Sequence, residues 1–516
     1  MPVDTRHADY DRRIEQVRKI RRFIEGEGAV LEYVLRLPGH VNLTATGNVA
    51  TEEQEADFKL FRERAYALPA ASRTLDAYVG MLMSPEPQIT EGPPALQKVI
   101  DDVDNKGEPF RRFAGRVVRE VISSGRCAVL IEGPERSPGN IRRLQRERAG
   151  EVPYVVKYNF ESVIDWRMEK VGGRWMLTHI RLLEDYTETV DEFTRKIKTQ
   201  IRVLDLVQGK YRSRVFRRAN KSIEGKGEKI VGENKNGVQT AEEWIQEGGD
   251  IFPTRGGEQL DHIPIVIFNV DSLDPQAVSK SPMSDLVEIL FRHLQNSASY
   301  ESALMYCGAP TPVLKGEPAT DAEGNPEPLG IGSSTGIVVP VDGDFAIVGL
   351  DPSGVGALKT AMEDKKAEMV AIGARAMMTE HGSNISTDTE KVRRVGEHSV
   401  LAQVALTASD GLTKVLEELA AWHKIELPEE FQVLLNTDFL PQGLQPGELT
   451  EWIAAVQSGV MPVSVFVEKL KKRGEVDPDM TVEDFRAALD EDDFGIEPGA
   501  GDDEGDDDDD EEEEAA

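Results

Sequence analysis

The sequence has few cysteines, few histidines and no long apolar run. Only Cys127 and Cys307 occur among 516 residues, and neither belongs to a CxxC pair. This argues against a disulfide scaffold and predicts two buried, reduced thiols in a protein made in a reducing cytoplasm. The eight histidines are scattered and never paired at metal-ligand spacing. No uncharged apolar stretch approaches the ~18 residues that a membrane span requires, so no membrane segment is expected.

The common catalytic and nucleotide-binding motifs are also missing. The chain contains no GxxxxGK[ST], HExxH or GxSxG motif, so no cofactor is expected and any ATP-driven motor belongs to a partner. The segment 102–107 resembles the start of a calcium loop, but Lys106 occupies a ligand position and Phe113 stands where the bidentate glutamate is needed. A turn before a helix is the favoured interpretation. His381 lies far from any second ligand and is expected at the surface.

The charge of the chain is strongly one-sided. The formal net charge is −33, and the tail Asp502–Glu514 supplies twelve of the acidic residues. A tail of Gly, Asp and Glu has nothing to bury, so residues 491–516 are expected to be disordered. A chain this acidic does not seek nucleic acid by electrostatics, although it can surround DNA without holding it.

The first half of the chain predicts an α+β fold. Helical patterns are followed, from residue 152 to 269, by alternating β-branched segments between turn signals. The expected helices are 11–22, 52–67, 71–83 and 110–124, and the expected strands are 127–131, 154–158, 162–167, 174–183, 196–207, 210–217 and 263–268. Twelve basic residues between Arg195 and Lys229 leave three interpretations open: nucleic-acid contact, a solvated sheet face, or contact with an acidic neighbouring subunit.

The second half places a small β-module between two helices. Ser281–Met305 is expected to be a helix with Ser281 as its N-cap and Leu286, Ile289, Leu290, His293, Leu294 and Ser297 as its buried stripe. Residues 309–351 predict short strands, and Ala357–Met378 predicts a second helix. Gly382 and Asn384 then interrupt the helical pattern, which resumes from Thr387 to about Glu418. Short helices follow between residues 447 and 489.

This order of parts resembles the portal proteins of tailed bacteriophages. The resemblance is carried by SRTLDAYVGMLMSPEPQI at Ser72–Ile89, VVREVISSGRCAVLIEGP at Val117–Pro134 and MVAIGARAMMTEHGSNIST at Met369–Thr387. It implies a wing (1–270), two stem helices (281–308 and 353–378), a clip (309–351), a tunnel loop (379–386), a long wing helix (387–420) and a helical crown (425–490). It also implies a dodecameric ring in the virion, at one capsid vertex.

The resemblance further implies roles for particular residues and partners. Double-stranded DNA would pass through the channel without sequence specificity, and the terminase large subunit, a head–tail connector protein and the major capsid protein would bind the ring. The residues expected at the tunnel loop are Thr379, Glu380, His381, Gly382, Ser383 and Asn384. Those expected at the clip are Lys315, Asp321, Glu323, Asn325 and Glu327. Lys359, Lys365, Lys366 and Arg375 would make weak phosphate contacts in the stem; the alternative for these cations is i,i+4 pairing with residues such as Glu363 on a solvated helix face.

Two other functions compete with the portal. One is another virion assembly or connector protein, for which an inserted β-module would have no purpose. The other is a metal-dependent hydrolase with residues 379–386 as a helical lid. The portal interpretation expects no catalysis by the chain itself.

Overall fold

The computed structural model describes most of the chain in two compact units. The described residues are 2–36, 51–133, 152–222, 239–308, 311–316, 343–348, 353–372, 387–437, 448–472 and 480–491, with short pieces at 42–44, 47–49, 232–233 and 476. The first unit spans Met1–Phe439 and the second spans Leu440–Ala516. The expected tunnel loop, the acidic tail and most of the expected clip lie outside the described residues.

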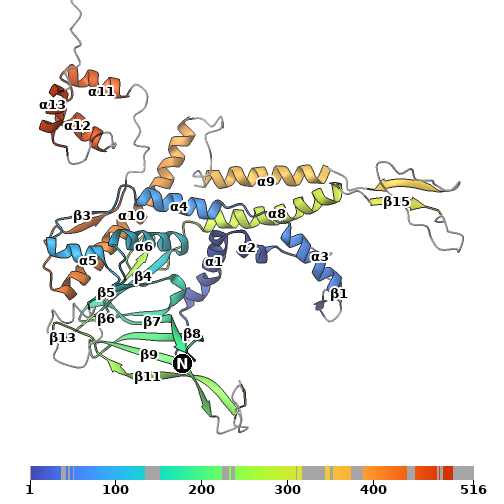
Figure 1. The fold of residues 1–516 in the computed structure, drawn as a ribbon, viewed down its shortest axis with the longest axis horizontal. Coiled ribbons are helices and arrows are strands. Elements are labelled where there is room, and N and C mark those ends of the chain that lie inside the picture. The colour runs from blue at the N-terminus through green and yellow to red at the C-terminus, as the bar shows by residue number, and fades with distance from the viewer. Residues whose placement is uncertain are drawn as a thin grey trace, which may run out of the picture. The chain divides into compact units, whose positions relative to one another are not determined.

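The first unit combines a helical block with antiparallel sheets, which confirms the α+β fold class (Figure 1). The longer helices of this unit are α1 (Ala8–Glu25), α3 (Glu52–Glu63), α4 (Ala70–Leu82), α6 (Phe110–Ser124), α8 (Ser284–Gly308), α9 (Ser353–Ala371) and α10 (Thr387–His423). The shorter helical elements are α2 (Glu27–Val30), η1 (Leu31–Tyr33), η3 (Pro94–Leu96), α5 (Gln97–Asp101) and η4 (Phe160–Ser162).

The largest sheet has six antiparallel strands in the order β10-β11-β9-β8-β7-β6. Its strands are β6 (Val163–Val171), β7 (Arg174–Thr189), β8 (Arg195–Val207), β9 (Lys210–Ser222), β10 (Gly232–Glu233) and β11 (Gln239–Ile251). The pairing of β7 with β8 runs from His179 opposite Asp205 to Thr189 opposite Arg195. The strands are longer than the sequence predicted, and β11 was not predicted at all.

A three-stranded sheet lies at the centre of the unit, in the order β14-β4-β5. It consists of β4 (Arg126–Glu132), β5 (Tyr154–Tyr158) and β14 (Ile265–Asn269). Four two-stranded sheets involve the short strands β1 (Asn42–Thr44), β2 (Gly47–Val49), β3 (Gln88–Thr90), β12 (Thr254–Arg255), β13 (Glu258–Gln259), β15 (Thr311–Lys315), β16 (Asp344–Val348) and β17 (Gln432–Leu434).

Helix α6 and strand β4 form the most buried part of the unit. Gly125 ends the helix at φ 84°, in the left-handed region, and a Cβ there would lie 2.4 Å from the carbonyl oxygen of Ser279. Only glycine therefore allows the chain to turn from α6 into β4 beside the loop that precedes α8. Cys127 is fully buried in β4, as predicted, and burial raises the pKa of its thiol to about 12. Cys307 in α8 is only half-buried.

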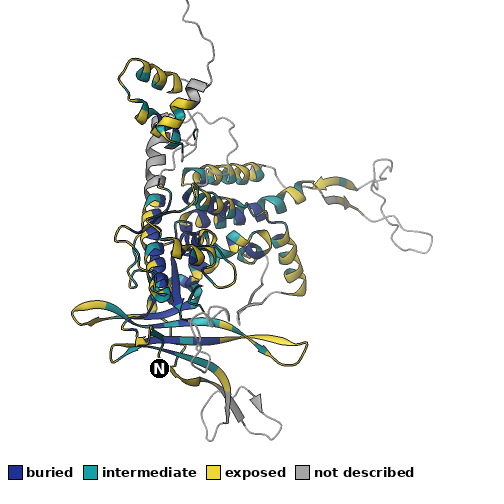
Figure 2. Cartoon of the chain, turned by 60° about the vertical axis from the view of Figure 1, so that its left-hand side comes forward, coloured by how far each residue is buried: buried dark blue, intermediate teal, exposed yellow. Residues whose placement is uncertain are grey.

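Two apolar clusters meet at the central sheet. One packs α4, α6, α8 and α10 together, while the other lies between α1, β4 and the six-stranded sheet. Helix α10 approaches β14 so closely that a Cβ on Gly411 would lie 2.2 Å from the ring of Phe268. Figure 2 shows this buried interior in dark blue along α10 and the central strands. The core thus depends on α10, which comes late in the sequence.

Residues from distant parts of the chain close this core. Strand β17 pairs with β3, so that Val433 lies opposite Ile89. The side-chain amide of Asn436 donates hydrogen bonds to the backbone carbonyls of Met81 and Ser84, at 2.8 and 2.6 Å. These contacts hold the segment after α10 against the end of α4.

Helix α8 begins three residues later than the sequence predicted. The Ser281 hydroxyl accepts a hydrogen bond from the Met283 amide and donates one to the Ile122 carbonyl, so it stabilises a turn before the helix. The predicted stripe is otherwise confirmed, since Leu286, Leu290, His293, Leu294 and Ser297 are buried, with Ile289 half-buried.

The described residues of the second unit form three short helices. These are α11 (Glu448–Gln457), α12 (Val463–Lys472) and α13 (Val482–Glu491), close to the helices predicted there. The rings of Phe466 and Phe485 meet edge to face at 6.3 Å, and Val467 and Leu470 are buried.

Candidate functional site

The candidate site is the helix pair α8–α9 with the β15–β16 hairpin between its two helices. Helix α9 packs along α8, and the hairpin lies at the end of the pair that is remote from the helical block (Figure 1). The first half of α8 contacts α1, α3 and α4. Beyond Ala298, no described residue of α8 is buried. The helix pair therefore extends out of the block that anchors it.

Helix α9 buries little of its surface. Met369 is its only described residue that is fully buried, while Ala357, Glu363 and Lys366 are exposed. At the hairpin end, apolar side chains are also exposed, namely Leu304, Met305, Val313, Ile347 and Val348. Within the single chain, the helix pair therefore leaves most of α9 and the apolar side chains at the hairpin end exposed.

The lysines expected in the stem lie on α9, whereas Arg375 lies outside the described residues. Lys359 is 3.9 Å from Glu363, which is the i,i+4 pair that the alternative interpretation expects. The ammonium of Lys365 donates a hydrogen bond to the Ala361 carbonyl at 3.3 Å. Lys366 forms no ion pair with a described residue. The three lysines thus differ in the ion pairs and hydrogen bonds that they form with described residues of the same chain.

His293 of α8 faces these lysines from below the surface. It is 1% exposed, and neither ring nitrogen has a hydrogen-bond partner among the described residues. Burial, together with the smaller effect of the charges of Lys366 and Lys365, lowers the pKa of His293 to about 4. The imidazole is therefore neutral at pH 7 and serves as part of the interface between α8 and α9.

Other residues expected at functional positions are largely outside the described part of the chain. Thr379–Asn384, Asp321, Glu323, Asn325 and Glu327 lie outside the described residues. Lys315 ends strand β15 and is exposed. The structure thus brings Lys315 and the α9 lysines onto one helix–hairpin–helix element.

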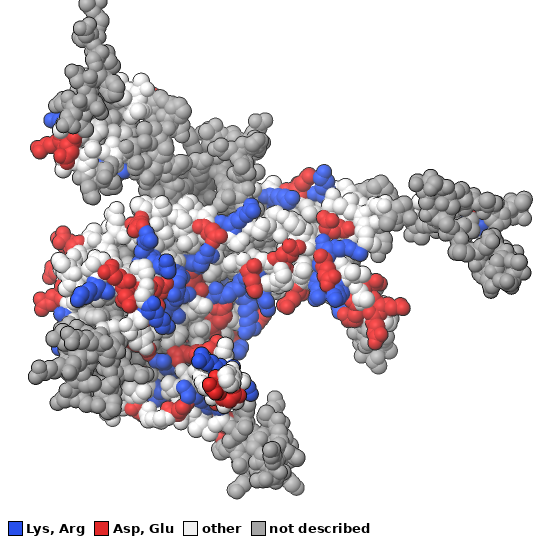
Figure 3. All heavy atoms as spheres, in the orientation of Figure 1, with Lys and Arg blue, Asp and Glu red and all other residues white. Residues whose placement is uncertain are grey.

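The basic stretch of the six-stranded sheet is mostly ion-paired. Arg212 and Arg214 both bind Asp205, at 2.8 and 2.6 Å, and Arg217 binds Glu247 at 2.5 Å. Burial alone would raise the pKa of Asp205, but the hydrogen bond from Arg212 and the charge of Arg214 lower it below its ordinary value. On the face shown in Figure 3, positive and negative side chains intermingle. Among the three interpretations of this stretch, the described residues favour a solvated, ion-paired sheet face.

The segment once compared with a calcium loop is a turn. The Asp102 carboxylate accepts hydrogen bonds from the Lys106 and Gly107 amides, and that of Asp104 accepts from Lys106 and Glu108. Carboxylates used in this way stabilise the turn before α6. Across the described ranges, no three His, Cys, Asp or Glu side chains gather as a metal site would require. No helix in those ranges is both long and apolar enough to cross a membrane.

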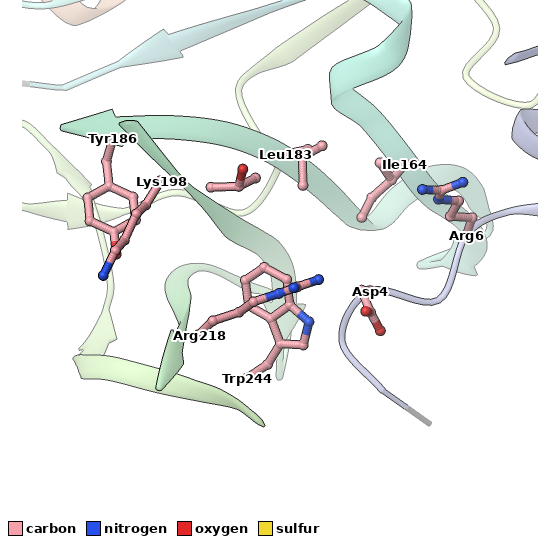
Figure 4. A pocket seen from close by; sticks show the side chains of 9 residues that line it. Asp4, Arg6, Ile164, Leu183, Tyr186, Lys198, Arg218 and Trp244 are labelled. Carbon is pink, nitrogen blue, oxygen red and sulfur yellow. The ribbon is translucent and has the colours of Figure 1, made fainter. Parts of the chain in front are cut away.

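A pocket on the six-stranded sheet was not anticipated from the sequence. Its volume is about 470 Å³, and its lining includes Arg6, Tyr186, Lys198, Arg218 and Trp244. Figure 4 shows Arg218 lying against the Trp244 ring, with Asp4 and Arg6 entering from the N-terminal segment; the guanidinium is 5.0 Å from the ring centroid. No local sequence signal marked it, because Tyr186 lies between Asp185 and Thr187, and Trp244 lies between Glu243 and Ile245.

Comparisons with known proteins give one domain family and several distant structures. Residues 282–423, which include the helix pair and α10, match a family described only as a domain of unknown function, DUF4055. A search of curated proteins finds no match.

The similar solved structures belong to gene transfer agent particles. The neck of a native particle with C12 symmetry is 13% identical, with 81% of this chain and 92% of that chain covered and a TM-score of 0.38. The virion of a native particle is 12% identical over the same shares, with a TM-score of 0.36. The neck of an empty particle with C6 symmetry is 13% identical, again over the same shares, with a TM-score of 0.37. At this distance no residue's role is transferred from them.

Proposed function

We propose that this chain is the repeating subunit of a portal ring in a phage or phage-like virion. The observation that carries the proposal is the helix pair α8–α9, which leaves the helical block with a hairpin at its end and buries almost none of α9. In a ring, each such pair would be flanked by two copies of itself. The surface that the single chain leaves open would then become an interface.

The hairpin supports closure of the ring in the same way. Val313, Ile347 and Val348 are exposed on its two strands. Exposed strand edges pair readily with another chain, and a head-to-tail contact repeated around an axis closes into a ring. In this proposal the hairpin is the clip, where the terminase large subunit and later a head–tail connector dock. The long helix α10 anchors the ring in the rest of the subunit, and the major capsid protein surrounds it.

The charge of the chain suits passage of DNA better than capture. With a net charge of −33, the subunit as a whole repels the phosphate backbone. The exposed Lys359 and Lys366 would supply only weak phosphate contacts, repeated in each copy. Because affinity for DNA rises steeply with the number of basic contacts, a mostly acidic bore lets the duplex slide without sequence specificity. In this proposal the chain itself catalyses no reaction.

The test is the shape of the purified assembly. Full-length protein imaged end-on by negative-stain electron microscopy should show rings with a central opening wide enough for a double helix. A monodisperse monomer or dimer at high concentration, or a closed disc, contradicts the proposal. Incubation with duplex DNA and Mg²⁺ or Mn²⁺ should leave the DNA intact; cleavage that one Asp or Glu substitution abolishes would favour the hydrolase.

A second test concerns the expected tunnel loop. Deleting His381–Asn384 should impair genome packaging or retention in particles but leave ring assembly intact, because the helix pair and the sheets do not include these residues. Rings counted by microscopy and packaged DNA measured after nuclease treatment separate the two effects. Loss of the rings themselves would contradict the position of this segment in the channel.

A further inference from the structure

The turn between β7 and β8 presents an aromatic side chain on a rigid support. Phe193 is 89% exposed, with Val190 at 52% and Ile197 at 75% beside it. The Asp191 carboxylate accepts hydrogen bonds from the Phe193 and Thr194 amides, at 2.9 and 2.7 Å. The Val190 amide also donates to the Thr194 carbonyl at 3.0 Å. We call residues 190–194 the ribbon tip.

Such a tip is suited to insertion into a partner. Aromatic side chains in desolvated pockets carry much of the energy of protein interfaces. A turn whose backbone is already held by hydrogen bonds loses less conformational entropy when it binds. Asp191 and Glu192 precede Phe193 in the tip, and Arg195 and Lys196 follow directly after it.

The pocket in Figure 4 has complementary chemistry. Trp244, Tyr186 and Leu183 contribute aromatic and apolar surface to its lining. The lining cations are partly paired, since Lys198 lies 2.7 Å from Glu188 and Arg6 lies 3.8 Å from Asp11. A volume of about 470 Å³ leaves room for a phenylalanine ring. A pocket with tryptophan and tyrosine walls is matched by an exposed aromatic side chain.

The ribbon tip cannot reach the pocket of its own chain. Tyr186 pairs with Lys198 and Asp185 with Thr199, on the same two strands that carry the tip. Asp185–Thr199 lies four residue steps from the last pair before the turn, Thr189–Arg195, which is about 13 Å of extended ribbon. The occupant must therefore come from another molecule.

We infer that the ribbon tip of one copy inserts into the Trp244 pocket of the next copy. A head-to-tail contact between the two different surfaces repeats from copy to copy, and it closes into a ring when the rotation between copies closes. This inference rests on the proposed function only in that copies of the chain assemble with one another. It adds a specific contact between the sheets, remote from the helix pair.

Disulfide trapping tests the contact directly. Phe193→Cys and Thr199→Cys are introduced together in a Cys307→Ser background, because Cys307 is partly exposed. A disulfide requires Cα atoms within about 7 Å, so the two new cysteines cannot join within one chain. Mild oxidation should give a ladder of covalent oligomers on non-reducing gels. The single variants should give no species above a dimer.

The outcomes separate this inference from the portal proposal. Rings seen by microscopy that yield no ladder overturn the tip–pocket contact and leave the proposed function standing. Absence of rings in the unmodified protein overturns the proposed function instead. A ladder from the double variant supports the contact whether or not the assembly has the expected opening.

A substitution in the tip gives a second readout with a matched control. Phe193→Ala should raise the concentration at which half the protein is assembled by about tenfold or more. Trp175→Ala is the control, because Trp175 is 66% exposed at the opposite end of β7. The contact is refuted if Phe193→Ala and Trp175→Ala shift assembly equally in sedimentation velocity.

Discussion

The α6–β4–α10 centre and the α8–α9 helix pair differ in what completes them. In the centre, side chains from three separate parts of the sequence form one buried cluster, as Val118, Val129 and Leu412 show. In the helix pair, α9 has a single fully buried described side chain, Met369, and polar and apolar residues share its exposed surface. The centre is complete within one chain. The helix pair is stable in the chain only through α8 and is completed, in our proposal, by neighbouring copies.

The largest expected effect comes from overfilling the centre. Gly411→Ala places a methyl group 2.2 Å from the Phe268 ring, so α10 must move away from β14. We expect a loss of about 3 kcal/mol in the free energy of unfolding, measured by denaturant titration. Gly80→Ala, in α4, is the control, because no atom lies within 4 Å of its Cβ; it should gain up to about 1 kcal/mol. If Gly411→Ala and Gly80→Ala changed the free energy of unfolding equally, packing around α10 would not differ from that around the open face of α4.

A smaller, local effect is expected in the helix pair. Met369→Ala removes the side chain that alone among the described residues of α9 is completely buried, at a cost of about 2 kcal/mol to the attachment of α9. Because α9 lies at the edge of the fold, the loss should appear as faster proteolysis within α9, with the main unfolding transition unchanged. Leu416→Ala, in the centre, should instead shift the main transition. A shift of the main transition by Met369→Ala would place α9 inside the cooperative core.

An ion cluster at the border of the centre predicts a pH effect. His262 lies 3.4 Å from Glu418 of α10 and 2.9 Å from Asp261, and Arg255 binds Glu418 at 2.7 Å. The hydrogen bond with Glu418 raises the pKa of His262, although burial opposes it. A raised pKa in the folded state stabilises the protein fully below the ordinary histidine pKa, and this stability is lost as pH rises through the folded value.

His262→Gln should therefore lower the free energy of unfolding more in acid than in base. We expect the variant to be less stable than the parent by about 1 kcal/mol or less at pH 5.5, with the difference shrinking toward pH 8.5. Urea unfolding of both proteins at the two pH values measures it. His179→Gln is the control: burial and the charge of Arg181 lower the pKa of His179, so its variant should not become relatively less stable in acid.

The smallest effect on stability is expected from the exposed charged residues of the helix pair. The Lys359–Glu363 pair spans 3.9 Å between side chains that are more than half exposed. Glu363→Ala should change the stability of the isolated chain by no more than about 0.5 kcal/mol. Thermal unfolding at low and high salt checks this value. A larger loss that salt abolishes would show that the pair fastens α9 more firmly than its exposure indicates.

Local sequence signals predicted the elements of the centre well. The helix Phe110–Ser124 and the glycine after it were predicted with their observed bounds, because the apolar period and the left-handed Gly125 both act locally. The stripe of α8 was predicted for the same reason. The start of α8 was not, because Ser281 binds Ile122, which is distant in sequence.

Strands and pockets that combine residues distant in the sequence were not predicted. Strand β11 contains acidic residues and two adjacent glycines, Gly248 and Gly249, and it forms a strand because β9 offers a paired edge. The Trp244 pocket collects side chains from the N-terminal segment and five strands, so no short pattern encodes it. Sequence periodicity reports which face of an element is buried, but not which elements meet.

The pairing of β17 with β3 has a consequence for synthesis. While the ribosome is still adding the residues after α10, the segment around Ile89 has already emerged and lacks the strand that completes it. Helix α10 and Asn436 likewise arrive only after most of the polypeptide is made. The nascent chain therefore remains incompletely folded until late in translation, and long-range closure of this kind is slow. During that interval, exposed apolar surface and the unpaired edge of β3 favour premature association of half-made subunits.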